Sequence, residues 1–504
     1  MDFLEKWDKS FMDKNLVNNI LKKNYILVFV ELVTLFSFLV AYICNINFPI
    51  ITIAVLMITG ISLYIYFSYK ENTLFSLVGI FTIVWYISIS LSQFRLNINQ
   101  IPFSCKTWVI LYLTYSLFIL GYFSNRKIKY NYQCIDFQIN KHKILLVIIV
   151  LFVTIICFLG VELYVSKEFP LFSNDPAAYL NFSISGIHYF VVSCILIPPL
   201  IIIYLDKNSF ASQKQKVILI LMAIICFLIP ILIVSRQLLL LGIILSSVTF
   251  IILNKKYEKK VVFSIMIIAI LAFTLLSLGR NQNSEYLNYV FNSTNQYTNH
   301  YFDSSFELTV EELDIYNKLY SGFDSFERIE LFELPMPIYQ IYMYITFNFD
   351  NLNFLIASTK QFYFGINIFY PILALTGIRF MFPLIDSISF PRYLTTFNTF
   401  PICFVPYSDF GILGLIIYMF VIGMLSQKIN NMKTSSVMNI IYYGLFVYSL
   451  LFSFFTSFFS NVTMVFYFAI LFLSRQYIYN ESSIIFKKLD DFLLKRVINY
   501  WNKL

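Results

Sequence analysis

The sequence predicts an all-α polytopic integral membrane protein, with about 12–14 transmembrane helices and a large helical outer loop. Of its 504 residues, 59% are hydrophobic and only 13% are charged, whereas a soluble domain carries about 25% charged residues. Apolar runs near twenty residues long recur along the whole chain, and each can cross a hydrocarbon core about 30 Å thick. Lysines gather in alternate connections between these runs, as they do in the cytoplasmic loops of membrane proteins.

Twelve apolar runs are the expected membrane spans. They cover residues 24–43, 47–66, 72–93, 107–124, 143–160, 187–205, 217–234, 238–253, 261–279, 408–426, 438–458 and 460–476. Segments 338–357 and 362–384 are weaker, because Asn348, Asp350, Asn351 and Asn353 interrupt the first of them. These two segments form either one more membrane hairpin or a re-entrant feature that surrounding protein shields.

The runs divide the chain into five parts. The parts are a cytoplasmic N-terminal segment at 1–23, a nine-helix transmembrane region at 24–279, a large periplasmic or extracellular loop at 280–407, three transmembrane helices at 408–476 and a basic amphipathic cytoplasmic tail at 477–504. The hairpin expected at 338–384 falls within the loop. Amphipathic character is expected in 1–23 as well as in the tail. The polar N-terminus without a small-residue cleavage site predicts no cleavable signal peptide.

Lysine predicts the orientation. With this topology 24 of the 27 lysines lie inside, and Lys106, Lys167 and Lys318 lie outside. Both termini are therefore expected in the cytoplasm. This distribution accounts for the net charge of +8, so no nucleic-acid partner is needed to explain it. The seven cysteines show no C-x-x-C spacing, so neither a disulfide framework nor a metal site is expected.

Arginine follows the opposite distribution. Three arginines are expected inside and six outside; the outer ones are Arg95, Arg236, Arg280, Arg328, Arg379 and Arg392. The planar guanidinium binds phosphate or carboxylate through two parallel hydrogen bonds and keeps its charge. At least two of the six are expected to bind an anionic ligand. The alternative is that the outer arginines form salt bridges within loops.

Arg236 is the most informative single residue. It stands between the apolar runs Val217–Val234 and Leu238–Leu253. The second run has 16 residues, or about 24 Å of helix, which is shorter than the core of about 30 Å. Arg236 is therefore expected slightly below the outer lipid surface, in a cavity where a lipid-linked phosphate would lie. Arg280 ends the next outward run, so the pair could hold one pyrophosphate; the alternative is that Arg280 snorkels at a helix end.

The outer loop combines acidic and aromatic residues over 302–333. Aromatic rings stack on the C–H faces of sugars, and carboxylates accept hydrogen bonds from their hydroxyls. The composition therefore suits a sugar ligand. The alternative is an amphipathic helical lid whose acidic face is only solvated.

Three short motifs resemble the Wzy-type oligosaccharide repeat-unit polymerases, also called O-antigen polymerases. They are Ser235-Arg236 before an aliphatic helix, Tyr393–Thr396, and Pro406–Gly414 leading into a helix. The resemblance covers the architecture from about residue 216 to 430. It implies a glycosyltransferase of the bacterial inner (plasma) membrane. Such an enzyme transfers a growing glycan from undecaprenyl pyrophosphate to a newly flipped, lipid-linked repeat unit on the outer face, without a cofactor or metal.

The resemblance also implies roles for individual residues. Arg236, Arg280 and Arg392 are expected to stabilise the departing pyrophosphate. His300 is the first candidate for the base, and Asp409 or an acid such as Glu285 is the alternative. Arg379, Tyr393 and Tyr407 are expected to bind substrate. An alternative for Asp409 is that it caps the helix that begins near Gly411.

Two other functions compete with the polymerase. One is an O-antigen ligase or another lipid-linked sugar transferase. The other is a flippase or transporter of lipid-linked oligosaccharide, although the sequence shows no clear internal duplication of the kind common in transporters. The expected partners are the undecaprenyl-pyrophosphate-linked oligosaccharide and membrane lipid, together with a chain-length regulator and a flippase.

Overall fold

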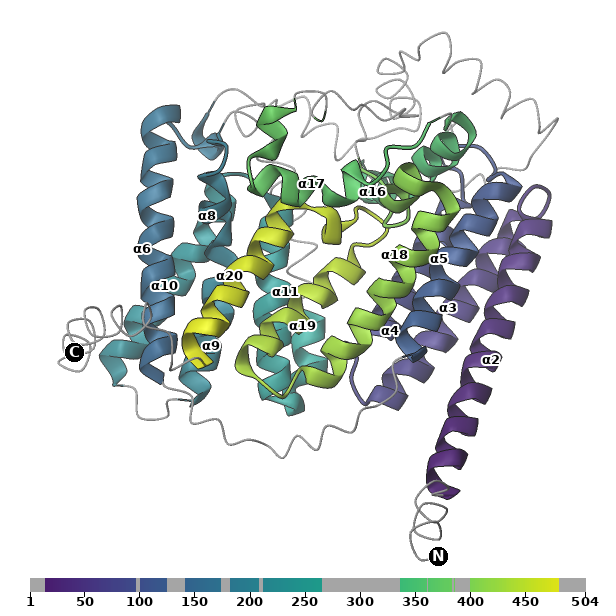
Figure 1. Ribbon diagram of the computed structural model, residues 1–504, viewed down its shortest axis with the longest axis horizontal. Coiled ribbons are helices and arrows are strands. Elements are labelled where there is room, and N and C mark those ends of the chain that lie inside the picture. The colour runs from purple at the N-terminus through teal and green to yellow at the C-terminus, as the bar shows by residue number, and fades with distance from the viewer. Residues whose placement is uncertain are drawn as a thin grey trace, which may run out of the picture.

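The structure is a computed structural model that describes residues 14–96, 100–124, 141–173, 182–207, 212–264, 336–359, 361–382, 385 and 399–479. Within these residues all regular secondary structure is helical (Figure 1). The α-helices are α2 (Lys14–Cys44), α3 (Pro49–Glu71), α4 (Leu77–Ser92), α5 (Cys105–Ser124), α6 (Lys141–Ser166), α8 (His188–Val192), α9 (Ile197–Lys207), α10 (Gln213–Leu232), α11 (Arg236–Leu253), α16 (Met336–Ser358), α17 (Ile366–Leu375), α18 (Phe404–Met432), α19 (Val437–Leu451) and α20 (Val462–Tyr479). The short 3-10 helices are η1 (Pro170–Phe172), η2 (Ser193–Leu196), η3 (Lys255–Tyr257), η4 (Ile378–Met381) and η6 (Phe458–Ser460).

Nine helical segments of the described residues are long and apolar enough to cross a membrane. Helices α4 and α19 match two further expected spans but have only 16 and 15 residues, or about 24 and 22 Å. The chain is therefore an all-α, multi-pass membrane protein, as the sequence predicts. The total of 12–14 spans stays a prediction, because most of the expected span 261–279 lies outside the described residues.

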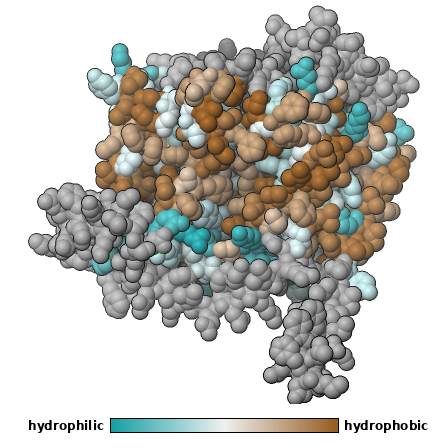
Figure 2. All heavy atoms as spheres, viewed as in Figure 1, coloured by the Kyte–Doolittle hydropathy of each residue, from teal (hydrophilic) through white to brown (hydrophobic). Residues whose placement is uncertain are grey.

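The surface supports a lipid environment. Figure 2 shows apolar side chains covering the middle of the molecule. Large hydrophobic side chains of α2 and α3 are mostly exposed; Phe29 is 63% exposed and Ile58 is 66% exposed. A water-soluble monomer rarely leaves so broad an apolar surface open. This exposed apolar surface is therefore suited to contact with lipid tails.

The helix ends differ from the expected ones where polar residues extend a helix past the apolar run. Helix α2 begins at Lys14, ten residues before the expected span at 24–43. Helix α18 begins at Phe404 and continues to Met432, whereas the expected span covers 408–426. A helix ends where its backbone hydrogen bonds stop and not where the lipid stops, so hydropathy locates the membrane section better than the helix ends.

The two ends of the bundle differ in their lysines. Among the described residues most lysines lie at one end, and only Lys106 and Lys167 lie at the other. One end, here called the lysine end, contains the α3–α4 turn, the start of α10 with Lys214, and the residues after α11 and α18 with Lys255 and Lys433. The Glu258 carboxylate, just after η3, joins two of these connections by accepting hydrogen bonds from Thr73 Oγ1 and the Leu74 amide, each at 2.6 Å. Which side of the membrane this end faces stays a prediction from the lysine distribution.

The opposite end, here called the arginine end, carries Arg95, Arg236 and Arg379. Arg236 is separated from Lys214 by α10 and from Lys255 by α11. These helices have 20 and 18 residues, or about 30 and 27 Å. Helices α16 and α17 lie along this end, at the top of Figure 1.

The geometry of α16 and α17 favours the re-entrant alternative over two crossing helices. Helix α17 has 10 residues, which span only about 15 Å. Helix α16 is not among the helices apolar enough to cross a membrane, and its Asn348, Asp350, Asn351 and Asn353 are all buried. Polar groups at this depth are tolerated where protein surrounds them.

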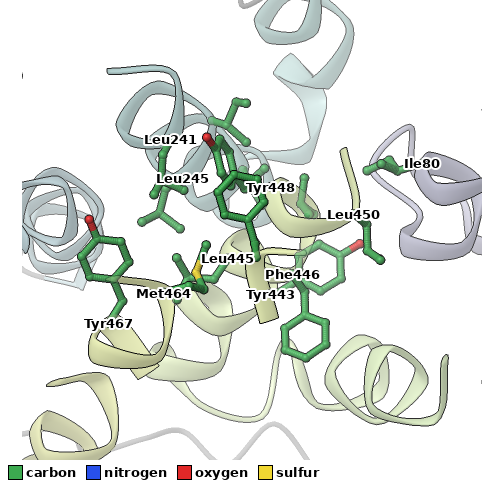
Figure 3. Packing of buried hydrophobic residues seen from close by; sticks show 14 of the residues in the cluster. Ile80, Leu241, Leu245, Tyr443, Leu445, Phe446, Tyr448, Leu450, Met464 and Tyr467 are labelled. Carbon is green, nitrogen blue, oxygen red and sulfur yellow. The ribbon is translucent and has the colours of Figure 1, made fainter. Parts of the chain in front are cut away.

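Close helix contacts hold the bundle together. A Cβ atom added to Gly121 of α5 would lie 2.1 Å from the Phe420 carbonyl oxygen of α18, and one added to Gly423 would lie 2.1 Å from the Phe118 oxygen. Glycine lets the two backbones approach this closely, and such close packing is a main source of helix association in lipid. Figure 3 shows another part of the core, where Leu241 and Leu245 of α11 face Tyr448 and Leu445 of α19.

Several expectations lie outside the described residues. They concern the outer-loop core at 302–333, the terminal segment at 1–13 and the part of the basic tail from 480 onward.

Candidate functional site at the arginine end

Arg236 is the first residue of α11 and follows a tight turn from α10. The preceding Val234 adopts a left-handed conformation with φ of 56°. The Ser235 amide donates to the Pro230 carbonyl at 2.8 Å, and the Ser235 hydroxyl caps α11 by accepting from the Leu238 amide at 3.4 Å. This turn places a half-buried arginine at the start of a helix.

The position of Arg236 is unfavourable for the helix itself. The N-terminus of a helix carries partial positive charge, so a cation there is repelled and an anion is attracted. The Tyr448 hydroxyl of α19 holds this turn by donating to the Gln237 carbonyl at 3.2 Å. An anion at this helix start would interact with the guanidinium and with the first backbone N–H groups of α11.

Arg379 lies in η4, directly after Gly377, whose φ of 76° makes a turn after α17. Its Nη1 donates to the Tyr370 hydroxyl at 3.0 Å, and its Nη2 donates to the Ser185 hydroxyl at 3.1 Å. The guanidinium also lies over the Phe380 ring, 4.8 Å from its centroid. These contacts orient the guanidinium group of Arg379.

Asp409 is fully buried and is bonded to α17. Its Oδ1 accepts from the Asn367 side chain at 2.6 Å and from the Asn367 amide at 3.3 Å, and its Oδ2 accepts from the Ile368 amide at 2.8 Å. The sequence suggested that Asp409 caps its own helix near Gly411. It instead satisfies the first N–H groups of a different helix, and this geometry favours capping over proton transfer.

Helix α17 connects two of the predicted site residues. Asp409 of α18 holds its first turn, and Tyr370, one turn later, accepts from Arg379. Gly411, with φ of 61° and ψ of −143°, breaks the regular conformation of α18 just after Asp409. Tyr407 lies half-buried in the turn of α18 before Asp409. The other predicted site residues, Arg280, His300, Arg392 and Tyr393, lie outside the described residues.

A buried polar cluster joins α16 to the α4–α5 connection. The Asp350 Oδ2 atom accepts from the Gln100 side chain at 3.0 Å, and Gln100 Oε1 accepts from the Tyr342 hydroxyl at 2.7 Å. The Asn353 side chain accepts from Thr107 Oγ1 at 2.6 Å. The sequence signal for this cluster was the group of polar residues that interrupts the apolar segment 338–357, and its function could not be assigned from sequence.

Arg95 belongs to the same region and has a structural role. It is 2% exposed, and its Nη2 donates to the Asn45 carbonyl at 2.5 Å and to the Asn45 side chain at 2.8 Å. Arg95 therefore ties the end of α2 to the end of α4.

Burial raises the pKa of Asp350 to about 8, although the Gln100 hydrogen bond and the Arg95 charge oppose the increase.

A Glu–His pair lies beside the Arg379 contacts. Glu162, near the end of α6, faces His188 at the start of α8, with Glu162 Oε1 3.0 Å from His188 Nδ1. The Ile184 amide also donates to Glu162 Oε1, at 3.2 Å. In the sequence Glu162 stands two residues after the expected span at 143–160. The partner lies 26 positions later in the sequence, so no local motif predicts the pair.

No group of three or more His, Cys, Asp or Glu side chains in the described part of the chain could hold a metal ion. The arginine end offers chemical groups in two places: Arg236 at the start of α11, and Arg379 with the Glu162–His188 pair at the α6–α8 connection. Comparison with family models gives no match, and neither the curated proteins nor the solved structures match this chain.

Proposed function

We propose that the chain is a glycosyltransferase that polymerises undecaprenyl-pyrophosphate-linked oligosaccharide repeat units into a surface polysaccharide, such as O-antigen, capsule or exopolysaccharide. The enzyme works at the outer face of the bacterial inner membrane, with both termini in the cytoplasm. The proposal starts from the resemblance of Ser235-Arg236, Tyr393–Thr396 and Pro406–Gly414 to the Wzy-type polymerases.

The observation that carries the proposal is the position of Arg236 and Arg379. Both stand at the end of the bundle opposite the lysine clusters. Arg236 lies a full helix length from Lys214. Arg379 contacts Ser185, which lies in the connection between α6 and α8. Lys141 is at the opposite end of α6. Because lysines are typical of the cytoplasmic side, this position supports the proposal that the two arginines face the side where lipid-linked repeat units are joined.

The chemistry of the reaction suits arginine. An acceptor hydroxyl attacks the anomeric carbon that joins the donor glycan to undecaprenyl pyrophosphate, and the carbon–oxygen bond to phosphate breaks. Negative charge then grows on the departing pyrophosphate. Guanidinium groups that are already oriented before the reaction stabilise this charge without reorganisation. The Tyr370 and Ser185 hydroxyls orient Arg379 in this way.

A reconstituted assay tests the proposed function. The purified full-length protein is placed in lipid nanodiscs with a purified undecaprenyl-pyrophosphate-linked repeat unit, a chelator and no nucleotide sugar. We expect a ladder of products that grow by whole repeat units, with release of undecaprenyl pyrophosphate. Absence of any product longer than one unit, with well-folded protein and the repeat unit of the producing strain, would falsify the polymerase proposal.

The same reaction distinguishes the competing functions. A ligase would leave the repeat unit unpolymerised and transfer it once to an added lipid acceptor such as lipid A–core. A flippase would form no new glycosidic bond, and it would move a labelled lipid-linked unit between the leaflets of a liposome. Each alternative therefore predicts a product that the polymerase reaction does not give.

A further inference from the structure

The Glu162–His188 pair has the geometry of an oriented proton acceptor. The His188 Nδ1 atom lies 3.0 Å from Glu162 Oε1 and 3.2 Å from Oε2. The Glu162 side chain is 1% exposed, whereas the His188 side chain is 27% exposed. The carboxylate is therefore enclosed by protein while the imidazole reaches the surface at the arginine end.

The Glu162 carboxylate faces Nδ1 of His188 and not Nε2. An ionised carboxylate can only accept, so Nδ1 must donate to it. In a neutral imidazole the other nitrogen, Nε2, then holds a lone pair. Among the described residues Nε2 of His188 has no hydrogen-bond partner. A base that a second group orients in this way is the usual arrangement for proton transfer from a hydroxyl.

The pair shares a short turn with Arg379. The Ile184 amide donates to Glu162, and the next residue, Ser185, accepts from Arg379 Nη2. The His188 amide closes this turn by donating to the Ile184 carbonyl at 3.0 Å. Figure 1 shows α6 and α8, which carry the pair, side by side. The oriented cation therefore contacts, through Ser185, the same five-residue turn (residues 184–188) that carries His188.

We propose that His188, oriented by Glu162, takes the proton from the acceptor sugar hydroxyl, beside the guanidinium of Arg379. This inference rests on the proposed function and names the base of that reaction. The hydroxyl oxygen forms the new bond to the anomeric carbon, the bond from that carbon to pyrophosphate breaks, and the hydroxyl proton moves to Nε2. The imidazolium afterwards returns the proton to water. The base is then a residue of the α6–α8 connection and not the loop residue His300.

The test compares His188→Gln with His142→Gln in the nanodisc lengthening assay. His142 lies at the other end of α6, at the lysine end, so its replacement is the matched control. For His188→Gln we expect kcat to fall by about 10²–10⁴-fold, the range for loss of a general base. KM and direct binding of the lipid-linked unit should change less than about threefold, because the base is not the group that holds the substrate. His142→Gln should keep wild-type kcat.

Glu162→Gln separates orientation from simple folding. An amide at this position can also donate to the ring, so Nδ1 is no longer held as the donor. We expect a loss in kcat that is smaller than that of His188→Gln, with thermal unfolding of both variants close to wild type.

A His188→Gln enzyme that keeps more than about a third of the wild-type kcat would overturn the assignment while the polymerase proposal stands. Loss of substrate binding that matches the loss of rate would also overturn it. If the wild-type protein itself lengthens no units, both proposals fall together.

Discussion

The Asp409 carboxylate of α18 accepts a hydrogen bond from the Asn367 side chain of α17, with 2.6 Å between Oδ1 and Nδ2. Two backbone N–H groups of the same helix turn complete its contacts. Because Tyr370 of this helix holds Arg379, a carboxylate in one helix positions a guanidinium that it does not touch.

We therefore predict that Asp409→Asn lowers stability more than it affects any chemical step. Loss of charge-assisted hydrogen bonds at a buried cap costs about 1–3 kcal/mol, which thermal unfolding of the purified protein would detect. Asn367→Ala should lower stability through the same contact, so the double variant should lose less than the sum of the two. Ser408→Ala serves as the control, because that hydroxyl donates only to the nearby Val405 carbonyl. Unchanged stability together with abolished lengthening would assign Asp409 to proton transfer instead.

The Asp350 carboxyl predicts a pH dependence of stability. Burial raises its pKa from 3.8 to about 8, so between these values the folded protein holds a proton that the unfolded chain releases. Stability should therefore fall as pH rises from about 4 to about 8, by at most about 1.4 kcal/mol per pH unit, and become independent of this group above that range.

Asp350→Asn checks this origin, because an amide resembles the protonated acid. In the variant, stability should no longer fall with pH through this group, and the variant should be more stable than wild type at about pH 8. Thermal midpoints measured between about pH 4 and about pH 8 check both outcomes. Asp206→Asn, at the exposed end of α9, is the control and should follow the wild-type curve. A wild-type slope that survives in Asp350→Asn would assign the pH dependence to other groups.

The sequence predicted the helical, multi-pass architecture because long apolar runs and clustered lysines report directly on the lipid environment. It could not predict the partners of buried polar groups. Asp409 bonds to Asn367, 42 positions away, and Asp350 bonds to Gln100, 250 positions away. Such pairs depend on how distant helices pack, and hydropathy carries no information on that packing. The outer excess of arginine was visible, but only the structure separates Arg95, which ties two helices together, from Arg236 and Arg379.

The α5–α18 contact should be sensitive to a single methyl group. Gly121→Ala and Gly423→Ala each place a Cβ about 2.1 Å from a backbone oxygen of the other helix, and the backbones must separate to relieve this overlap. Overpacking of this kind costs about 1–3 kcal/mol, so both variants should unfold at lower temperature. Gly160→Ala in α6 is the matched control, because nothing lies within 4 Å of its added Cβ. Equal stability of all three variants would show that α5 and α18 are not packed this closely in the membrane.

The final prediction concerns the guanidinium of Arg236. Arg236→Ala should abolish or strongly reduce the glycan ladder in a strain that lacks its own polymerase, because the departing pyrophosphate loses a preorganised cation; removal of one such group costs about 10²–10³-fold in rate. Arg236→Lys should remain poor, since an ammonium keeps the charge but not the planar pair of donors. Arg475→Ala is the control, because Arg475 lies near the end of α20 and is expected on the cytoplasmic side.

Membrane insertion of each variant is checked by its level in the membrane fraction. A normal ladder from well-inserted Arg236→Ala would remove this residue from the site, and full activity of Arg236→Lys would show that charge alone is required there.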